Sequence, residues 1–241
     1  MQDDFLLMKG QAEYMRVSIP ITLPPILDRS IADILHSAPQ TLLELVDWYG
    51  SPLHVIWPHI LQRNVDAFRA VLHAYALNFE IFYGAKVNKS LALVRAAVES
   101  GIGVDVSSIY ELRDALAAGA DPSRICATDP VKTSEFHAAL IATASLISID
   151  SIEEFSELEQ CVRKLAPLTS TPRKVRLLLC YRPASATASR FGMDGNDLLQ
   201  CLHRLVQFRE LFAFEGFHFL LAVMRMKPVS RHCANLLPTS I

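Results

Sequence analysis

The sequence predicts an α/β protein with a parallel sheet, in the form of an incomplete (β/α)8 TIM-like barrel of about six βα units. Short apolar runs alternate with helical patterns, which requires right-handed crossovers and parallel strands. No GxGxxG or GxxxxGK[ST] turn follows the first apolar run. A doubly wound nucleotide-binding sheet usually carries such a turn, so its absence favours the barrel. At 241 residues, 51% of them hydrophobic, the chain is long enough to bury a full core.

Residues 1–40 are predicted to form an irregular N-terminal arm, because four prolines interrupt its apolar runs. Only a short helix around Ile31–Leu35 is expected within it. Three segments then lead into the alternating part of the chain. They are a helix, an extended apolar segment and a long amphipathic helix, at 41–49, 51–57 and 60–76.

Six apolar strands follow in the predicted order, with helices between them. The strands are expected at 80–83, 103–106, 124–127, 146–149, 175–181 and 214–221. The helices are expected at 91–99, 108–119, 134–144, from 151 onward, and at 198–211. Two of these helices begin with a capping box, in which a serine and a glutamate satisfy each other's free amides. The pairs are Ser108 with Glu111 and Ser151 with Glu154.

The composition excludes several classes of function. The formal net charge is −2 and no dense lysine and arginine cluster occurs, so we expect no nucleic acid partner. The first residues are acidic and no apolar run is long enough to cross a bilayer, so we expect a soluble, cytoplasmic protein without a membrane partner. The five cysteines lack CxxC spacing, so we expect reduced thiols and no metal site.

The candidate catalytic residue is Lys86, in the stretch Phe82–Ser90. It stands where an apolar strand gives way to a polar turn, immediately before a helical pattern. In a βα unit this position is the C-terminal rim, where a lysine can bond the aldehyde of a cofactor. Most lysines at strand ends are only solvated. The apolar neighbours Tyr83 and Val87 favour the reactive interpretation for Lys86, whereas Lys89 is expected to be solvated.

Five segments of the chain match motifs of one known family, in that family's order. They are Tyr49–Leu53, Tyr83–Asn88 (similar to Y-A-x-K-x-N), Gly103–Leu112 (similar to D-x-x-S-x-x-E-L), Ile149–Glu154 and Ser189–Met193. From about residue 49 to residue 220 the sequence therefore resembles the pyridoxal phosphate-dependent ornithine/diaminopimelate/arginine decarboxylases. These proteins belong to the alanine racemase-like barrels.

The resemblance implies a function and a site. Lys86 would carry pyridoxal 5'-phosphate, and Asp105 would lie near that lysine and hold its orientation or charge state. The implied reaction is decarboxylation of a small amino acid, for which the cofactor is the electron sink. The family also implies a homodimer of full-length chains, because its β domain completes the partner's site. For Asp105 the other interpretation is an ordinary cap of the next helix.

Several positions depart from the family pattern. Leu220 stands where a histidine of the H-F-H-x-G-S segment packs on the cofactor ring, and His218 matches the first histidine of that segment. We expect His218 to be a hydrogen-bonded core residue. Cys180 stands where many relatives carry arginine, and Arg182 is the nearest substitute, two residues further along the strand.

Residues 222–241 resemble neither the remaining barrel strands nor the family's phosphate loop, its ring-nitrogen acid or its β domain. The predicted domains are therefore an arm (1–40), a partial pyridoxal phosphate-binding barrel (41–221) without the C-terminal β domain, and an unrelated tail (222–241). The functions left open are an amino-acid decarboxylase or an inactive fragment of one, a non-catalytic or truncated relative that binds full-length subunits, and an alanine racemase-like protein. A racemase needs a second base, for which we find no tyrosine candidate. The residues do not select among ornithine, arginine and diaminopimelate as substrate.

Overall fold

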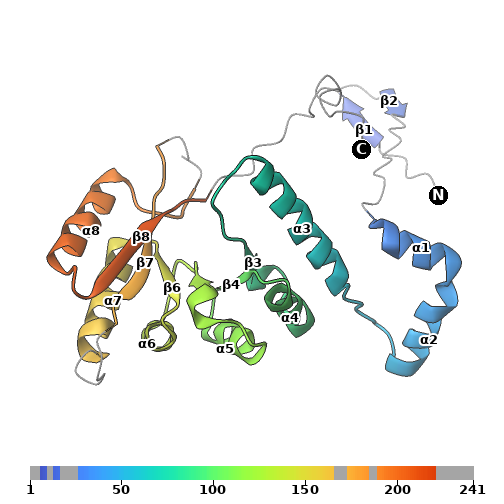
Figure 1. Ribbon diagram of the computed structural model, residues 1–241. Helices are drawn as coiled ribbons and strands as arrows, with labels where there is room; N and C mark the ends of the chain where they lie inside the picture. The colour runs from blue at the N-terminus through green and yellow to red at the C-terminus, as the bar shows by residue number, and fades with distance from the viewer. Residues whose placement is uncertain (1–5, 10–12, 17–26, 166–172, 185–188, 221–241) are drawn as a thin grey trace. The chain divides into compact units, whose positions relative to one another are not determined.

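The computed structural model describes residues 6–9, 13–16, 27–165, 173–184 and 189–220 (Figure 1). The chain divides into two compact units between Val55 and Ile56. The elements of the first unit are β1 (Leu6–Lys9) and its antiparallel partner β2 (Glu13–Arg16), followed by the helices α1 (Arg29–Ser37) and α2 (Pro39–Tyr49).

The first unit is more regular than its prolines predict. Helix α1 is longer than the expected segment Ile31–Leu35, because the side chain of Asp28 accepts the backbone N–H of Ser30 at 2.9 Å and caps the helix early. Pro39 begins α2 instead of interrupting it, since a proline needs no intrahelical donor in the first turn. Gly50 ends α2 with φ +85°, as expected from its position.

The second unit contains a six-stranded parallel sheet, which confirms the predicted fold class. The strands lie in chain order, so each one pairs with the strand that follows it in the sequence. A doubly wound sheet would reverse its order at one point, whereas a barrel would not. The strands are β3 (Phe82–Gly84), β4 (Gly103–Val106), β5 (Ile125–Ala127), β6 (Leu146–Ile149), β7 (Val175–Cys180) and β8 (Phe212–His218).

Helices connect these strands, and Figure 1 shows them following one another along the sheet. Helix α3 (Pro58–Ala74) precedes β3, the first strand of this sheet. The connecting elements are η1 (Ala85–Val87), α4 (Leu91–Glu99), α5 (Ile109–Ala117), η2 (Pro122–Arg124), α6 (Ser134–Thr143), α7 (Ile152–Leu165) and α8 (Gly195–Gln207). Helix α8 starts three residues before its expected position, because Asp194 accepts the backbone N–H groups of Asn196 and Asp197. The extended segment 51–57 forms no strand.

The core lies around the central strands, whose residues are buried on both faces of the sheet. All residues of β5 and β6 are buried. This explains why these strands appear in the sequence as continuous apolar runs without alternation. The largest fully buried side chains of the helices and strands include Phe155, Leu112, Ile125, Leu140, Ile147, Ile149, Leu158, Leu177 and Leu179.

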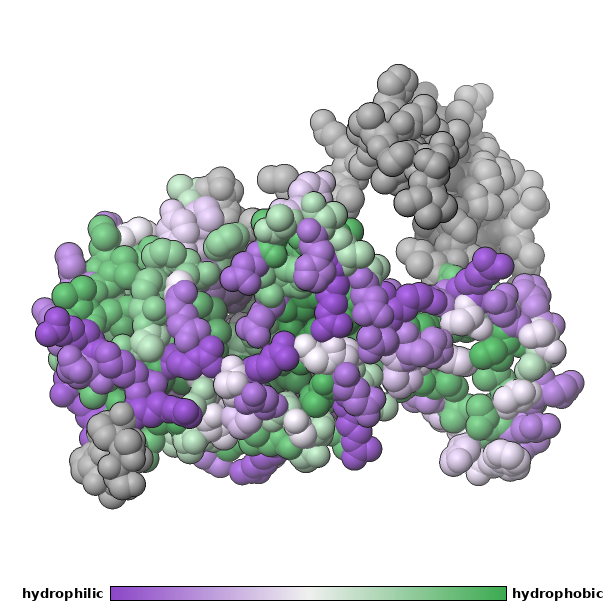
Figure 2. Space-filling view, in the orientation of Figure 1, coloured by the Kyte–Doolittle hydropathy of each residue, from purple (hydrophilic) through white to green (hydrophobic). Residues whose placement is uncertain are grey.

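Within the described residues, β3 and β8 each pair with only one neighbouring strand. Figure 2 shows hydrophobic side chains at the surface near β8, the last strand of the sheet, and the neighbouring helix α8. On and just after β8, Phe214, Phe217, Phe219 and Leu220 are each between 40% and 50% exposed. An exposed apolar edge strand of this kind is a place where further strands can pair. The described sheet is therefore part of a barrel that is open at both edges.

The two predicted capping boxes are formed with a shift of one residue. As expected, the N–H of Glu111 donates to Ser108 Oγ at 3.2 Å, and the N–H of Glu154 donates to Ser151 Oγ at 3.1 Å. The return bonds, however, go to the residue before each serine. Glu111 Oε2 accepts the N–H of Ser107, and Glu154 Oε2 accepts the N–H of Asp150, both at 2.7 Å. Each glutamate is 4% exposed and thus ties a helix to the strand end before it.

The described cysteines, Cys126, Cys161, Cys180 and Cys201, carry free thiols. None of the helices in the described ranges combines the length and the apolar character needed to cross a membrane. The predicted tail, residues 222–241, lies outside the described residues. Its separation as a distinct segment therefore stays a prediction.

Candidate functional site

Lys86 lies in the short helix η1, directly after β3, with its side chain exposed. The hydroxyl of Tyr83 donates to the carbonyl oxygen of Asn88 at 2.8 Å and closes the turn around the lysine. Ala85 is buried, but Val87 is 81% exposed. The apolar surround expected for Lys86 is therefore formed on one side only, and the amine is open to an incoming molecule.

Asp105 lies on β4, in register with Gly84 at the end of β3. Both oxygens of its carboxylate lie within hydrogen-bond distance of the Thr128 hydroxyl, at 2.8 and 2.9 Å. Burial raises the pKa of Asp105 above its ordinary value, while the Thr128 hydroxyl and the charges of Lys86 and His218 act in the opposite direction. Asp105 does not cap the next helix, because Ser108 fills that position.

His218 ends β8 and is half-buried, with Nδ1 at 2.8 Å from Ser148 Oγ on β6. The histidine is hydrogen-bonded, as predicted, but its charge also acts on Asp105. His218 therefore belongs to the same group of side chains as the lysine and the acid. Leu220, predicted to take the position that stacks on the cofactor ring, is 44% exposed.

The burial of His218 predicts a pH dependence of stability. Burial lowers the pKa of His218 below its ordinary value of 6.5, although Asp105 and Asp150 act in the opposite direction. Below that pH the unfolded chain binds more protons than the folded one, so the free energy of unfolding falls on acidification. The slope for one histidine is at most about 1.4 kcal/mol per pH unit.

Urea unfolding between about pH 7 and about pH 5 measures this slope. We expect His218→Gln to lose less stability across that range than the unmodified protein does. His203→Gln, a substitution at an exposed position on α8, is the matched control and should keep the original slope. An unchanged slope in His218→Gln would show that the buried imidazole is not the group responsible.

Cys180 ends β7, and its thiol does not supply the positive charge that an arginine would bring to this position. Burial, followed by the neighbouring Asp150 carboxylate, raises the pKa of its thiol to about 12, so the thiol is unreactive at neutral pH. The backbone of Arg182 instead pairs with Met193, and the N–H of Gly192 donates to Asp150 Oδ1 at 2.9 Å. The segment Ser189–Met193 thus returns to the ends of β6 and β7.

Lys89 is solvated, as predicted, and it also has an ionic partner. Its side chain is 68% exposed, but Nζ lies 3.0 Å from Glu111 Oε1, a carboxylate that is itself buried. Lys89 is thus paired with the acid that holds the start of α5 (Ile109–Ala117). The two lysines of this turn therefore have different surroundings, and Lys86 is the one whose charge acts on Asp105.

Sequence reasoning missed Thr128 and Ser148, which lie 23 and 70 residues from their partners Asp105 and His218. Thr128 directly follows the buried strand β5, and Ser148 is the last residue but one of the buried strand β6. Because parallel strands all end at the same edge of a sheet, that position was the available signal. We call this end of the sheet, where the strands have their C-terminal ends, the functional edge. The groups that meet there are Lys86, Asp105, Thr128, Ser148, Asp150 and His218.

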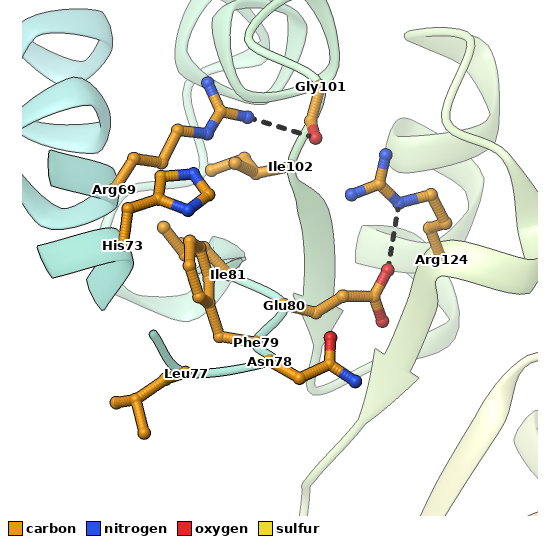
Figure 3. A pocket seen from close by; sticks show the side chains of 10 residues that line it. All are labelled: Arg69, His73, Leu77, Asn78, Phe79, Glu80, Ile81, Gly101, Ile102 and Arg124. Carbon is orange, nitrogen blue, oxygen red and sulfur yellow. Dashed lines mark hydrogen bonds and ion pairs between the residues drawn. The ribbon is translucent and has the colours of Figure 1, made fainter. Parts of the chain in front are cut away.

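A cavity of about 250 Å³ lies at the opposite ends of the strands (Figure 3). It is lined by residues that precede β3, β4 and β5, among them Arg69, Glu80 and Arg124. Both guanidinium groups are engaged. Arg69 donates to the carbonyl oxygens of Ser100 and Gly101, and Arg124 pairs with Glu80 at 3.3 Å. Because residues at the N-terminal ends of barrel strands serve stability, we place the functional site at the Lys86 end.

The fold and the functional edge together define a class of protein. It is a parallel α/β barrel with an amine, that of Lys86, and a carboxylate, that of Asp105, at the C-terminal ends of its strands. The sequence profile of the pyridoxal-dependent decarboxylase pyridoxal binding domain matches residues 61–211, which is more than half of the chain. The chain belongs to this family. The cofactor of the family is pyridoxal phosphate, as the resemblance implied.

Individual relatives support this assignment. An uncharacterized protein of Sinorhizobium fredii, y4yA, is 42% identical over 203 residues, which are 84% of this chain and 43% of that protein. The diaminopimelate decarboxylase of Methanothermobacter thermautotrophicus is 37% identical over 120 residues, which are 49% of this chain and 28% of that protein. The chain spans less than half the length of these curated relatives.

Solved structures show the same fold. The diaminopimelate decarboxylase of M. jannaschii in complex with L-lysine aligns with a TM-score of 0.65 and 21% identity, over 75% of this chain and 44% of that one. A lysine/ornithine decarboxylase from Vibrio vulnificus complexed with putrescine aligns with a TM-score of 0.60 and 16% identity, over 82% and 47% of the two chains. The described strands therefore correspond to part of such a barrel.

Proposed function

We propose that this chain is the cofactor-binding part of a cytoplasmic amino-acid decarboxylase of the ornithine/diaminopimelate/arginine type, in which Lys86 carries pyridoxal phosphate. The observation that carries this proposal is the position of Lys86. Its exposed amine directly follows β3, and its charge acts on Asp105, which lies in register with the end of that strand. These observations support the proposal, because parallel barrels bind their ligands at the C-terminal ends of the strands, where this amine and this acid are found.

The residues at this edge fit the aldehyde end of pyridoxal phosphate. A primary amine such as that of Lys86 bonds an aldehyde carbon, and it must be accessible to do so. Asp105 has the charge opposite to that of the lysine, and its carboxylate is held by the Thr128 hydroxyl at 2.8 Å. When bound, the cofactor supplies an electron sink for the charge left when a carboxylate departs.

The remaining chemistry is that of the protein groups. Lys86 holds the cofactor, and Asp105 fixes the orientation or the charge state of the lysine. His218 is positioned by Ser148 at 2.8 Å and adds a titratable group on the other side of the same edge. These groups position and charge the reacting centre, which is the protein's usual contribution in cofactor-dependent catalysis.

The substrate we propose is an amino acid with a second amine or a guanidinium group. Supporting this choice, relatives of the chain are named diaminopimelate decarboxylases, and a structural neighbour is named a lysine/ornithine decarboxylase. The homodimer implied by the family is likewise a proposal for the full-length protein. Turnover would require the remainder of a protein of the relatives' length, since this chain spans less than half of it.

The test is a titration of the purified chain with pyridoxal phosphate, followed by borohydride reduction and peptide mapping. We expect one stoichiometric label, on the peptide that contains Lys86. The reaction needs only the amine and the aldehyde, so it does not depend on turnover. The absence of an adduct, or labels distributed over surface lysines, would contradict the proposal.

A further inference from the structure

A buried ion pair lies behind the functional edge, and sequence reasoning did not single it out. Lys132, in the segment after β5, has a fully buried side chain, and its ammonium has three acceptors. These are the carbonyl oxygens of Asp129 and Ser148, at 2.5 and 2.6 Å, and Glu154 Oε1 at 2.6 Å. An ammonium has three donors, so all of them are used.

Such a cluster is a poor way to gain stability alone. Removing an ammonium from water carries a desolvation penalty that pairing often only offsets, so an apolar side chain of similar volume is often equally stable. What the ammonium provides is geometry. Its three acceptors come from three separate segments, namely the turn after β5, strand β6 and the start of α7.

These bonds fix the C-terminal end of β6 from two sides. Lys132 binds the carbonyl oxygen of Ser148 directly. Glu154, held by Lys132 through Oε1, accepts the N–H of Asp150 through Oε2 at 2.7 Å. The backbone groups of Ser148 and Asp150 are thus hydrogen-bonded to one buried ion pair, Lys132 and Glu154. The side chains of Ser148 and Asp150 remain available for other contacts.

Both of those side chains reach the functional edge. Ser148 Oγ lies 2.8 Å from Nδ1 of His218, and Asp150 Oδ1 accepts the N–H of Gly192 at 2.9 Å. Gly192 has φ +86°, and a Cβ there would lie 3.0 Å from the backbone nitrogen of Arg182, so this segment has little room to shift. The end of β6 therefore sets where β8 and the loop after β7 meet it.

We infer that Lys132 is a positioning residue, whose buried ammonium fixes the end of β6 and through it the Ser148–His218 and Asp150–Gly192 contacts. The inference rests on the proposed function in that these contacts lie at the edge assigned to the cofactor. The competing explanation is that Lys132 only neutralises Glu154. His137 lies in the same cluster, with Nε2 at 3.6 Å from Glu154 Oε1 and no hydrogen bond among the described residues.

The test uses the double variant Lys132→Met/Glu154→Gln, which removes both charges and keeps side chains of similar length. Two NMR readouts report on contacts that neither substitution touches directly. They are the hydrogen-exchange rate of the Gly192 amide and the ¹⁵N shift of His218 Nδ1. We expect exchange at Gly192 to become at least about 10-fold faster, and the Nδ1 shift to move toward that of a free imidazole.

The matched control is Arg204→Met/Glu159→Gln, which removes a 2.6 Å ion pair that is likewise anchored on α7 but lies away from β6. This control should leave both readouts unchanged. A folded Lys132→Met/Glu154→Gln variant with both readouts unchanged would show that Lys132 only balances a charge. Should that variant fail to fold, Lys132→Arg decides the question, because arginine keeps the charge but cannot place three donors on one nitrogen.

We expect Lys132→Arg to show the same loss of protection at Gly192, and full protection in that variant would overturn the inference. The cofactor is left out of all these measurements. Their outcome is therefore independent of whether Lys86 carries pyridoxal phosphate, which the labelling experiment decides separately. A failure of one proposal can then be told from a failure of the other.

Discussion

Replacing Lys86 by alanine is expected to abolish covalent attachment of pyridoxal phosphate to this chain. The amine of Lys86 is exposed at the end of β3 and is the group that the proposed site offers to the cofactor aldehyde. Without it, borohydride should fix no adduct on the peptide that carries the label in the unmodified protein. Mass spectrometry of the reduced, digested protein measures this as complete loss of the labelled peptide.

The matched control is Lys89→Ala, three residues further along the same turn. Lys89 is paired with Glu111 at 3.0 Å and is directed to the start of α5, so its removal should leave the label on Lys86 intact. A stoichiometric adduct that persists in Lys86→Ala would contradict the assignment. If the label disappears in Lys89→Ala instead, the attachment site lies on the other lysine of the turn.

A methyl group at Gly103 is expected to destabilise the protein by about 1–3 kcal/mol. Gly103 begins β4 in register with Phe82 on β3. A Cβ at this position would meet the Phe82 ring, and it would lie 2.7 Å from the backbone carbonyl oxygen of Arg124. The ring can turn aside, but the carbonyl belongs to the chain that leads into β5, so the strands themselves must separate.

Urea denaturation of Gly103→Ala measures this cost as a fall in the free energy of unfolding. Gly195→Ala is the matched control, because a Cβ at Gly195 meets no atom within 4 Å. That substitution should instead stabilise the protein by about 0.4–1 kcal/mol through the lower entropy of the unfolded chain. Equal stabilities for Gly103→Ala and the unmodified protein would show that β3 can move away from β4 at no cost.

The central elements of the fold could be predicted from the sequence because local and long-range preferences agree there. Strands β4 and β6 and helix α4 have the bounds that their apolar patterns predict. Both strands are enclosed by turn signals and are mostly apolar and buried, β6 along its whole length and β4 at all positions except Asp105. Pro39 does not interrupt a helix, contrary to the prediction. It is the first residue of α2, where the backbone N–H that proline lacks would have no acceptor within the helix.

The candidate site was predictable only in part, for a different reason. Lys86 and Asp105 follow from motifs that are continuous in the sequence. The contacts of Thr128 with Asp105 and of Ser148 with His218 depend on the register between strands, which no local pattern specifies. Glu154 likewise satisfies the N–H of Asp150 instead of that of Ser151, and Glu111 makes the same shifted bond to Ser107, which the capping-box pattern alone does not specify.

The chain-order pairing of the six strands has a consequence for synthesis on the ribosome. Each strand emerges next to the strand with which it will pair, so the sheet can grow vectorially and each step closes only a short loop. At every stage the newest strand is the one that awaits a partner. Among the described strands β8 is the last to emerge, and its exposed Phe214 and Phe217 stay open for the next pairing step.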